Sequence, residues 1–312
     1  MVRAHALLCS ILFAACTAKE QAPPPRPIDE TIEIAPRGTP DTKVLEPGAE
    51  PRRVLKLHPA VGTDETFEMR MGMRMGIRQG GGQLPSVAIP TTVTRMRSKV
   101  QEVEGSVFSV AQTVEGVELI PQADTPPQVT TQMRAAIDPL VHYRATVRMD
   151  ERGAVLGGTV VVPGDLPAMV KPQMEQLAQN MGQIAVPLPP DAIGVGARWT
   201  ATTDLDQSGM KLRQSGEYVL LALEGEHATI DATITQTLLE PEIQVPGMFG
   251  TTAKVGDFRS SGTSKLELDL DHLAPTNVAM QMDLHMAMDM TVLGQAQHTE
   301  MDLGLELQMK RN

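Results

Sequence analysis

Methionine recurs at every second residue in two stretches of this chain, at 67–77 and at 278–292. Its thioether sulfur is a soft ligand for Cu(I), and Met-x-Met runs accompanied by histidine are typical of exported copper proteins. Methionine is also an adaptable filler of cores and of apolar pockets. The methionines concerned are Met69, Met71, Met73, Met75, Met280, Met282, Met286, Met288 and Met290.

The period of two predicts that both stretches are β-strands with one apolar face. Neighbours on one face of a strand lie about 7 Å apart, so adjacent sulfurs cannot share a metal without a bulge or a partner strand. His285 falls on the opposite face, and Leu284 and Val292 occupy methionine positions of the pattern. We therefore predict that the methionine faces form a core or line an apolar pocket, with Cu(I) binding as the alternative.

No other group of residues matches a catalytic or metal-binding pattern. The histidines lack HExxH or any other ligand spacing, and Ser260, Ser261 and Ser264 lie outside a GxSxG context. The two cysteines, Cys9 and Cys16, both lie in the first 16 residues, so the rest of the chain offers no thiol. We predict a protein that is not an enzyme and that, apart from the copper alternative, holds no metal and no cofactor.

The N-terminus has the pattern of an export signal. An apolar run at 6–15 follows Arg3 and ends in small residues, which is typical of a signal peptide. The sequence Phe13-Ala14-Ala15-Cys16 resembles the lipobox of bacterial lipoproteins. The resemblance implies cleavage after residue 15 and lipidation of Cys16, and Thr17 in place of Asp implies the outer membrane. We expect the mature protein on the periplasmic side of that membrane, with the cell surface left open.

Residues 16–52 are rich in proline and charge and poor in periodic apolar residues, which predicts a disordered tether behind the lipidated cysteine. The net charge of the whole chain is −11, which argues against nucleic acid as a partner, because phosphate binding needs a basic field. The expected partners are the membrane, through the lipid anchor, and an apolar small molecule or lipid. The sequence indicates no particular protein partner.

Residues 53–312 are expected to form a single β-rich domain of two related halves, 53–162 and 193–312. Most segments alternate with a period of two, whereas 166–183 has helical spacing that places Met174, Leu177 and Met181 on one face. We predict a mainly β fold, in which two antiparallel β-meanders form a curved sheet or open barrel around that central amphipathic helix. Arginines at 70–78 and acidic residues at 283–306 predict that strand 66–78 lies beside the C-terminal strands.

The two halves show matching turns, as expected of a duplication. Glu104-Gly105 and Glu224-Gly225 each join two alternating segments and lie 120 residues apart. Met149-Asp150 and Leu270-Asp271 each end a segment in a turn, 121 residues apart. Upstream, Gly62 with Phe67 is matched to Gly194 with Trp199, 132 residues apart.

The centre of the chain also resembles a known group of proteins. A strand and turn at 143–153, a helix, and then Leu188-Pro189-x3-Ile193-Gly194-x-Gly196-x2-Trp199 resemble the signature of a family of uncharacterised exported bacterial proteins, many of them lipoproteins. The resemblance covers roughly 140–205 and implies a topology but no catalytic residue. We expect a lipoprotein that binds an apolar ligand in a Met-lined cavity; the alternative is a non-enzymatic envelope-structural or protein-interaction lipoprotein.

Overall fold

The computed structural model describes residues 29–36, 39–80, 82–83, 87–123, 125–162, 186–207, 209–244, 252–292 and 295–312. Cys16 and the predicted helix 166–183, with Met174, Leu177 and Met181, lie outside these residues. Within them, no helix is long and apolar enough to cross a membrane.

Nearly all of the described strands belong to one antiparallel sheet, and the predicted mainly β fold is confirmed. From one edge to the other the order is β1 (Glu30–Ile34), β9 (Val155–Val162), β8 (Arg144–Asp150), β7 (Val107–Ile120), β6 (Thr91–Glu104), β3 (Asp64–Gln79), β16 (Gln295–Arg311), β15 (Asn277–Val292), β14 (Thr252–Asp269), β12 (His227–Leu238), β11 (Met210–Glu224), β10 (Arg198–Gln207) and β2 (Asp41–Glu46). The short strands β4 (Gly82–Gln83) and β5 (Val87–Ala88) pair with β3, and β13 (Glu242–Gln244) pairs with β14.

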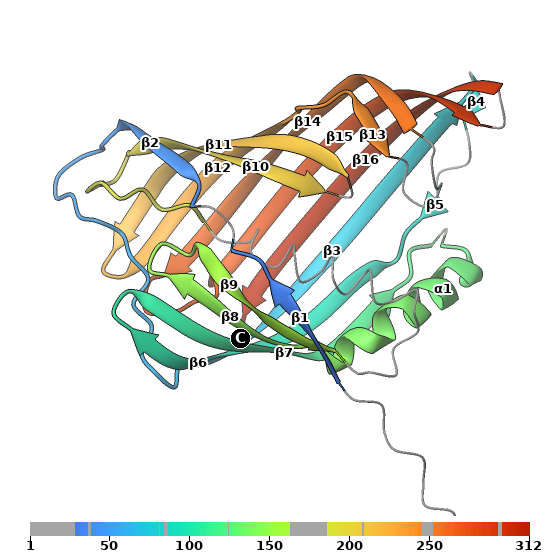
Figure 1. Cartoon of the computed structure of the whole chain (residues 1–312). Helices are drawn as coiled ribbons and strands as arrows, with labels where there is room; N and C mark the ends of the chain where they lie inside the picture. Colours follow the sequence, from blue (N-terminus) through green and yellow to red (C-terminus); the bar gives the residue numbers. More distant parts are fainter. Residues whose placement is uncertain are drawn as a thin grey trace, which may run out of the picture.

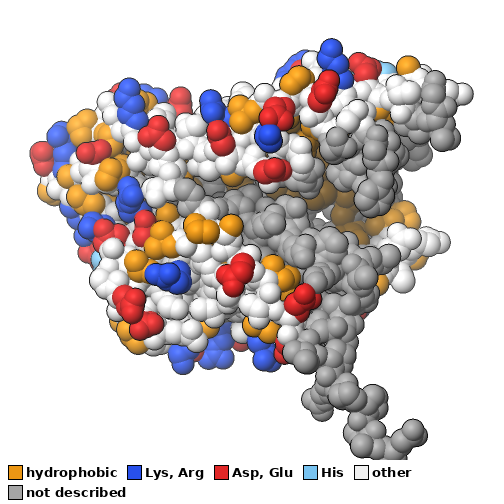
Figure 2. Space-filling model, in the orientation of Figure 1, with side chains coloured by type: hydrophobic (Ala, Val, Ile, Leu, Met, Phe, Trp, Pro, Cys, Tyr) orange, Lys and Arg blue, Asp and Glu red, His pale blue; other side chains and the backbone are white. Residues whose placement is uncertain are grey.

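The sheet is strongly curved and does not close into a barrel (Figure 1). Strands β10 to β15 form its upper part in that view, β6 to β9 form its lower part, and β3 and β16 join the two. Hydrophobic side chains are visible in the hollow between the two parts, whereas charged side chains are spread over the outer surface (Figure 2). The separation of hydrophobic and charged side chains onto opposite faces follows from strand geometry. In β12, for example, successive side chains alternate between exposed and buried positions.

The segment before residue 53 supplies both edge strands, so the prediction of a disordered tether through residue 52 is wrong for 30–34 and 41–46. Strand β1 pairs with β9, and β2 pairs with β10 at the opposite edge. The physical reason is that each edge of an open sheet offers unpaired backbone groups that a short extended segment can satisfy. Ile34 is buried at one edge, and residues 35–40 link the two edge strands.

Two sets of strands pair in chain order: β3, β6, β7, β8 and β9, and then β10, β11, β12, β14 and β15. Their irregularities coincide. A bulge follows the pair Val100–Val110 between β6 and β7, and another follows Leu220–Ile230 between β11 and β12, 120 residues later. The hairpins then turn through Gly105 at φ +61° and Gly225 at φ +58°. A duplication predicts such coincidences.

Hydrogen bonds correct one of the matched positions. The Gly62 N–H donates to Val100 O at 2.9 Å, and the Gly196 N–H donates to the equivalent Leu220 O at 2.8 Å. Gly62 therefore corresponds to Gly196, 134 residues away, instead of to Gly194. With this register Trp199 corresponds to Glu65 and not to Phe67, because Glu65 pairs with Ser98 as Trp199 pairs with Tyr218.

Helix α1 (Pro127–Ile137) and the 3₁₀ turn η1 (Asp138–His142) lead from β7 to β8 and lie at one end of the sheet (Figure 1). Pro127 suits the first helical position, where a backbone N–H has no intrahelical partner. The η1 turn is followed by Tyr143, which is 1% exposed. The turn thus places the buried Tyr143 on the inner side of the curved sheet.

Candidate functional site: an apolar cavity in the first half

The two methionine strands confirm the predicted alternation and lie on either side of β16. Met71, Met73 and Met75 of β3 face leucines of β16, and those leucines face Met280, Met282 and Leu284 of β15. The leucines are Leu303, Leu305 and Leu307. Two strand spacings of about 4.8 Å separate the methionine backbones of β3 from those of β15, so the register does not gather their sulfurs into a copper site.

The outer face of the same strands confirms that strand 66–78 lies beside the C-terminal strands. Arg74 donates to Glu306 at 3.2 Å, and Arg78 donates to Glu300 at 2.8 Å and to Asp302 at 3.0 Å. These ion pairs are exposed to solvent, so each contributes at most about 1 kcal/mol to stability. Among the described residues, no group of three or more His, Cys, Asp or Glu side chains is arranged to hold a metal.

The remaining predicted methionines separate into two environments. Met286 and Met288 are buried in a small cluster with Ile243, Ala253 and Val255, and Met290 packs against that cluster. Met69 packs instead against the large core, which contains Trp199 and Tyr143, and lies directly opposite Met309. The methionine faces therefore contribute to core at one end and to a cavity wall at the other.

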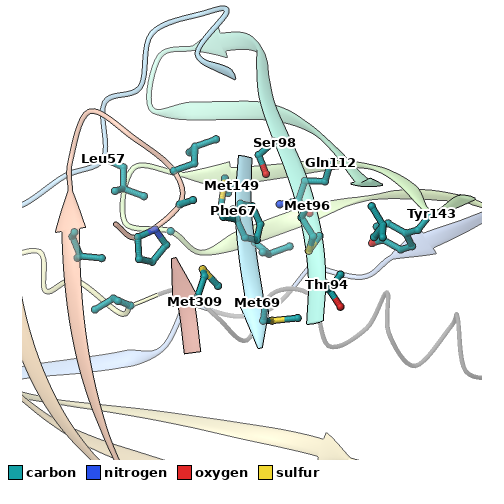
Figure 3. A pocket seen from close by; sticks show the side chains of 18 of the residues that line it. Leu57, Phe67, Met69, Thr94, Met96, Ser98, Gln112, Tyr143, Met149 and Met309 are labelled. Carbon is teal, nitrogen blue, oxygen red and sulfur yellow. The ribbon is translucent and has the colours of Figure 1, made fainter. Parts of the chain in front are cut away.

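The cavity lies in the hollow of the first half and has a volume of about 280 Å³ (Figure 3). Strands β3 and β6 to β9 supply most of its wall, together with Leu140 and Tyr143. The remainder comes from β14, β16, the loop that contains Leu273–Pro275, and Val186 and Leu188. Within the part of the chain that the structure describes, four methionines and no charged side chain line it. These methionines are Met69, Met96, Met149 and Met309.

Of the predicted methionines that lie within the described part of the chain, Met69 alone lines this cavity. Met96, Met149 and Met309 were not among the predicted residues, although each lies on the apolar face of an alternating strand. The signal that could have found Met96 is the alternation in β6, where Met96 and Val100 are buried and Arg95, Arg97 and Lys99 are exposed.

Two buried polar atoms of the cavity wall have no hydrogen-bond partner among the described residues: the hydroxyl oxygen of Tyr143 and Oε1 of Gln112. They come from neighbouring strand positions, since the Val114 N–H donates to Tyr143 O at 3.3 Å and Gln112 is two residues before Val114. Burial raises the pKa of the Tyr143 phenol, so the hydroxyl stays protonated and able to donate at neutral pH. Ser98 and Thr94 add two further buried hydroxyls to the same wall.

A group of polar contacts, named the latch below, holds the loop that contains Leu273–Pro275 beside the cavity. The buried carboxylate of Glu65 accepts hydrogen bonds from the N–H groups of Leu273 and Ala274, each at 3.0 Å, and lies 3.1 Å from Nδ1 of His272. The Arg311 guanidinium donates to Asp269 at 2.9 Å and holds the start of the same loop. Burial alone would raise the pKa of Asp269, but hydrogen bonds from Arg311 and from the Asp271 N–H lower it overall, with the charges of His272 and Arg311 adding to this effect.

The equivalent space in the second half is filled. Trp199 is fully buried and stacks on Tyr218 with ring centroids 5.4 Å apart, while its indole N–H donates to Pro187 O at 2.9 Å. The Tyr218 ring covers Gly216 so closely that a Cβ there would come within 2.5 Å of it. By the register, Tyr218 corresponds to Ser98 and Gly216 to Met96, so an aromatic pair occupies what is a cavity in the first half.

The glycines of the central signature have a structural role. The Gly194 N–H donates to Pro47 O at 2.9 Å and the Ala49 N–H donates to Val195 O at 2.8 Å, so two backbones run in contact. A Cβ on Gly194 would collide with the Ala49 carbonyl oxygen. With Ile193 and Trp199 fully buried, the signature seals the second half and supplies no reacting group.

Comparison of the sequence with protein-family models and with curated proteins found no match.

Proposed function

We propose that this protein binds an apolar small molecule or lipid in the cavity of its first half. The observation that carries the proposal is the 280 Å³ cavity itself, which is lined by apolar side chains and four methionines and lies next to a half where the corresponding space is filled. Methionine suits such a wall because its unbranched side chain adapts to ligands of different shape.

The size of the cavity sets the scale of the ligand. An engineered apolar cavity of about 150 Å³ accepts benzene, so a cavity of nearly twice that volume has room for about twelve non-hydrogen atoms. Only part of a membrane lipid fits, such as one acyl segment, whereas a small amphiphile fits whole.

The proposal places the protein at the outer membrane, anchored through lipid on Cys16 and facing the periplasm. The support is the N-terminal sequence alone: an apolar segment of signal-peptide length, two alanines and then the cysteine. In this setting the role is binding or carriage of the ligand near the membrane surface, without catalysis.

The competing function is an envelope-structural or protein-interaction lipoprotein. It would be favoured by a contiguous exposed apolar patch. The large apolar side chains that are exposed among the described residues lie on separate elements, for example Leu45 on β2, Val161 on β9 and Leu221 on β11. This scatter supports the ligand-binding proposal over the interaction proposal.

Native mass spectrometry of the full chain extracted from membranes tests the proposal. We expect a mass above that of the lipidated polypeptide, and collisional activation should release an apolar molecule. A bare lipidated mass, together with no stabilisation by added alkyl compounds, would contradict ligand binding and favour the structural role. A mass without diacylglycerol on the mature chain would instead contradict the anchor.

A further inference from the structure

We propose that the ligand of the cavity carries one uncharged hydrogen-bonding head group, which Tyr143 and Gln112 recognise, on an apolar body of about a dozen non-hydrogen atoms. A medium-chain alcohol is the simplest member of this class, and amides and protonated acids belong to it as well. This inference rests on the proposed binding function and specifies its ligand class.

The unpartnered polar atoms carry the argument. A buried hydroxyl or amide without a partner is unfavourable, so nearly all such groups in folded proteins are hydrogen-bonded. Tyr143 is 1% exposed, and its hydroxyl has no hydrogen-bond partner among the described residues. The Oε1 atom of Gln112 is also buried and has no partner among them. Both residues line the cavity, and Figure 3 shows them on the side of it where Met96 lies.

The two atoms have complementary capacities. The Tyr143 hydroxyl can donate and accept, whereas Oε1 of Gln112 can only accept. On adjacent antiparallel strands their residues are diagonal neighbours, for which the backbone separation is about 7–8 Å, so one small group can lie between the two side chains. An alcohol hydroxyl can accept from Tyr143 and donate to Gln112 at the same time.

The cavity selects against charge. Among the described residues no Lys, Arg, Asp or Glu side chain lines it, so an ionised head group would lose its water without gaining a counter-charge from them. Glu65, the nearest acidic group of the latch, already accepts two backbone hydrogen bonds and one His272 contact. A phosphate or a carboxylate head group is therefore disfavoured.

The second half shows that the polar wall is not a requirement of the sheet. At the positions that correspond to Gln112 and Ser98 it has Ala232 and Tyr218, and there Tyr218 stacks on Trp199. Polar side chains at these two positions are therefore specific to the first half, where both residues line the cavity.

Calorimetric titration with four decyl probes tests the inference: 1-decanol and 1-chlorodecane below their solubility limits, and decanoate and decyltrimethylammonium below their critical micelle concentrations. In the wild-type protein we expect 1-decanol to bind about tenfold more tightly than the other three. Tyr143→Phe should remove that preference while 1-chlorodecane binds as before. The matched control is Tyr218→Phe, the same chemical change in the filled half, which should leave the preference intact.

Each other outcome overturns a defined part of the account. Equal binding of 1-decanol and 1-chlorodecane would overturn head-group recognition and leave the apolar site standing. Tightest binding of decanoate or of the ammonium compound would overturn the preference for an uncharged head. Failure of all four probes to bind at their solubility limits would remove the proposed function as well.

Discussion

The two halves of the sheet use equivalent positions in opposite ways. In the second half Trp199 and Tyr218 stack over Gly216 and fill the hollow. In the first half the corresponding positions are Glu65, Ser98 and Met96, and a cavity of about 280 Å³ remains. The same backbone arrangement can thus enclose either a packed core or a cavity, and a few side chains determine which of the two forms.

Different kinds of interaction stabilise the ends of the two halves. An aromatic pair and the close contact of Gly194 with Ala49 stabilise the second half, whereas the Glu65 and Asp269 latch stabilises the first half through hydrogen bonds and an ion pair. Packing of apolar surface is insensitive to pH, but a carboxylate latch is not.

The largest expected effect is the loss of the aromatic filling. Trp199→Ala should lower the free energy of unfolding by about 3–5 kcal/mol, because a fully buried indole leaves a cavity and an unpaired Pro187 carbonyl. Phe67→Ala in the hollow half should cost less, since Phe67 already borders a cavity. Urea unfolding measures both, and an equal or larger loss for Phe67→Ala would contradict the distinction between the halves.

The next effect concerns the two signature glycines. Gly194→Ala should cost roughly 2–3 kcal/mol, because the new Cβ forces the Ala49 backbone away. Gly196→Ala should cost about 1 kcal/mol, since its φ of +83° disfavours a side chain although nothing lies within 4 Å. The reverse ranking in denaturant titrations would show that the backbone contact is not what seals the filled half.

Acid should weaken the ion pair between Asp269 and Arg311. The pKa of Asp269 is lowered in the folded state, so its contribution to stability is complete above its ordinary pKa of about 3.8 and is lost as the pH falls further through the lowered value. Arg311→Leu should cost about 2 kcal/mol at pH 7 and make stability less dependent on pH below 4. Urea unfolding of the wild type and of Arg311→Leu between pH 6 and pH 2 measures this effect; an equal loss of stability in both proteins would contradict the contribution of the Asp269 ion pair.

The smallest effect has the opposite sign. Tyr143→Phe should raise the stability of the ligand-free protein by up to about 1 kcal/mol, because it removes a buried hydroxyl without a partner among the described residues. Tyr218→Phe should give no such gain. Thermal unfolding of the two variants compares them, and destabilisation by Tyr143→Phe would indicate that the hydroxyl is already satisfied in the empty protein.

Alternation was sufficient to predict the strands and the neighbour of the first methionine strand, because a period of two is a local property and the Arg and acidic faces are complementary. The cavity was not predictable in this way, since its wall combines Met69, Tyr143 and Leu273, which meet only when the sheet curves. The edge strands were missed because β1 and β2 lie in a proline-rich, charged segment whose strand character comes from pairing with β9 and β10. The two-residue error in matching Trp199 arose from aligning aromatic types instead of hydrogen-bonded positions.

A double substitution in the first half tests whether these side chains account for the difference between the two halves. In Met96→Gly/Ser98→Tyr the first half receives two of the residues that fill the other half, with the new tyrosine able to cover the new glycine as Tyr218 covers Gly216. We expect this variant to fold and to lose binding of 1-decanol. A matched change outside the cavity is Met288→Leu in the second methionine cluster, which consists of Met286, Met288 and Met290. This variant should still bind 1-decanol.

Methyl NMR of methionine-labelled protein, titrated with 1-decanol, tests the central claim most directly. The account predicts shifts at Met69, Met96, Met149 and Met309, which line the cavity, no shifts at Met286, Met288 and Met290, and no response in the Met96→Gly/Ser98→Tyr variant. Shifts confined to the second methionine cluster, or an unchanged response in the filled variant, would contradict the assignment of the first half as the container.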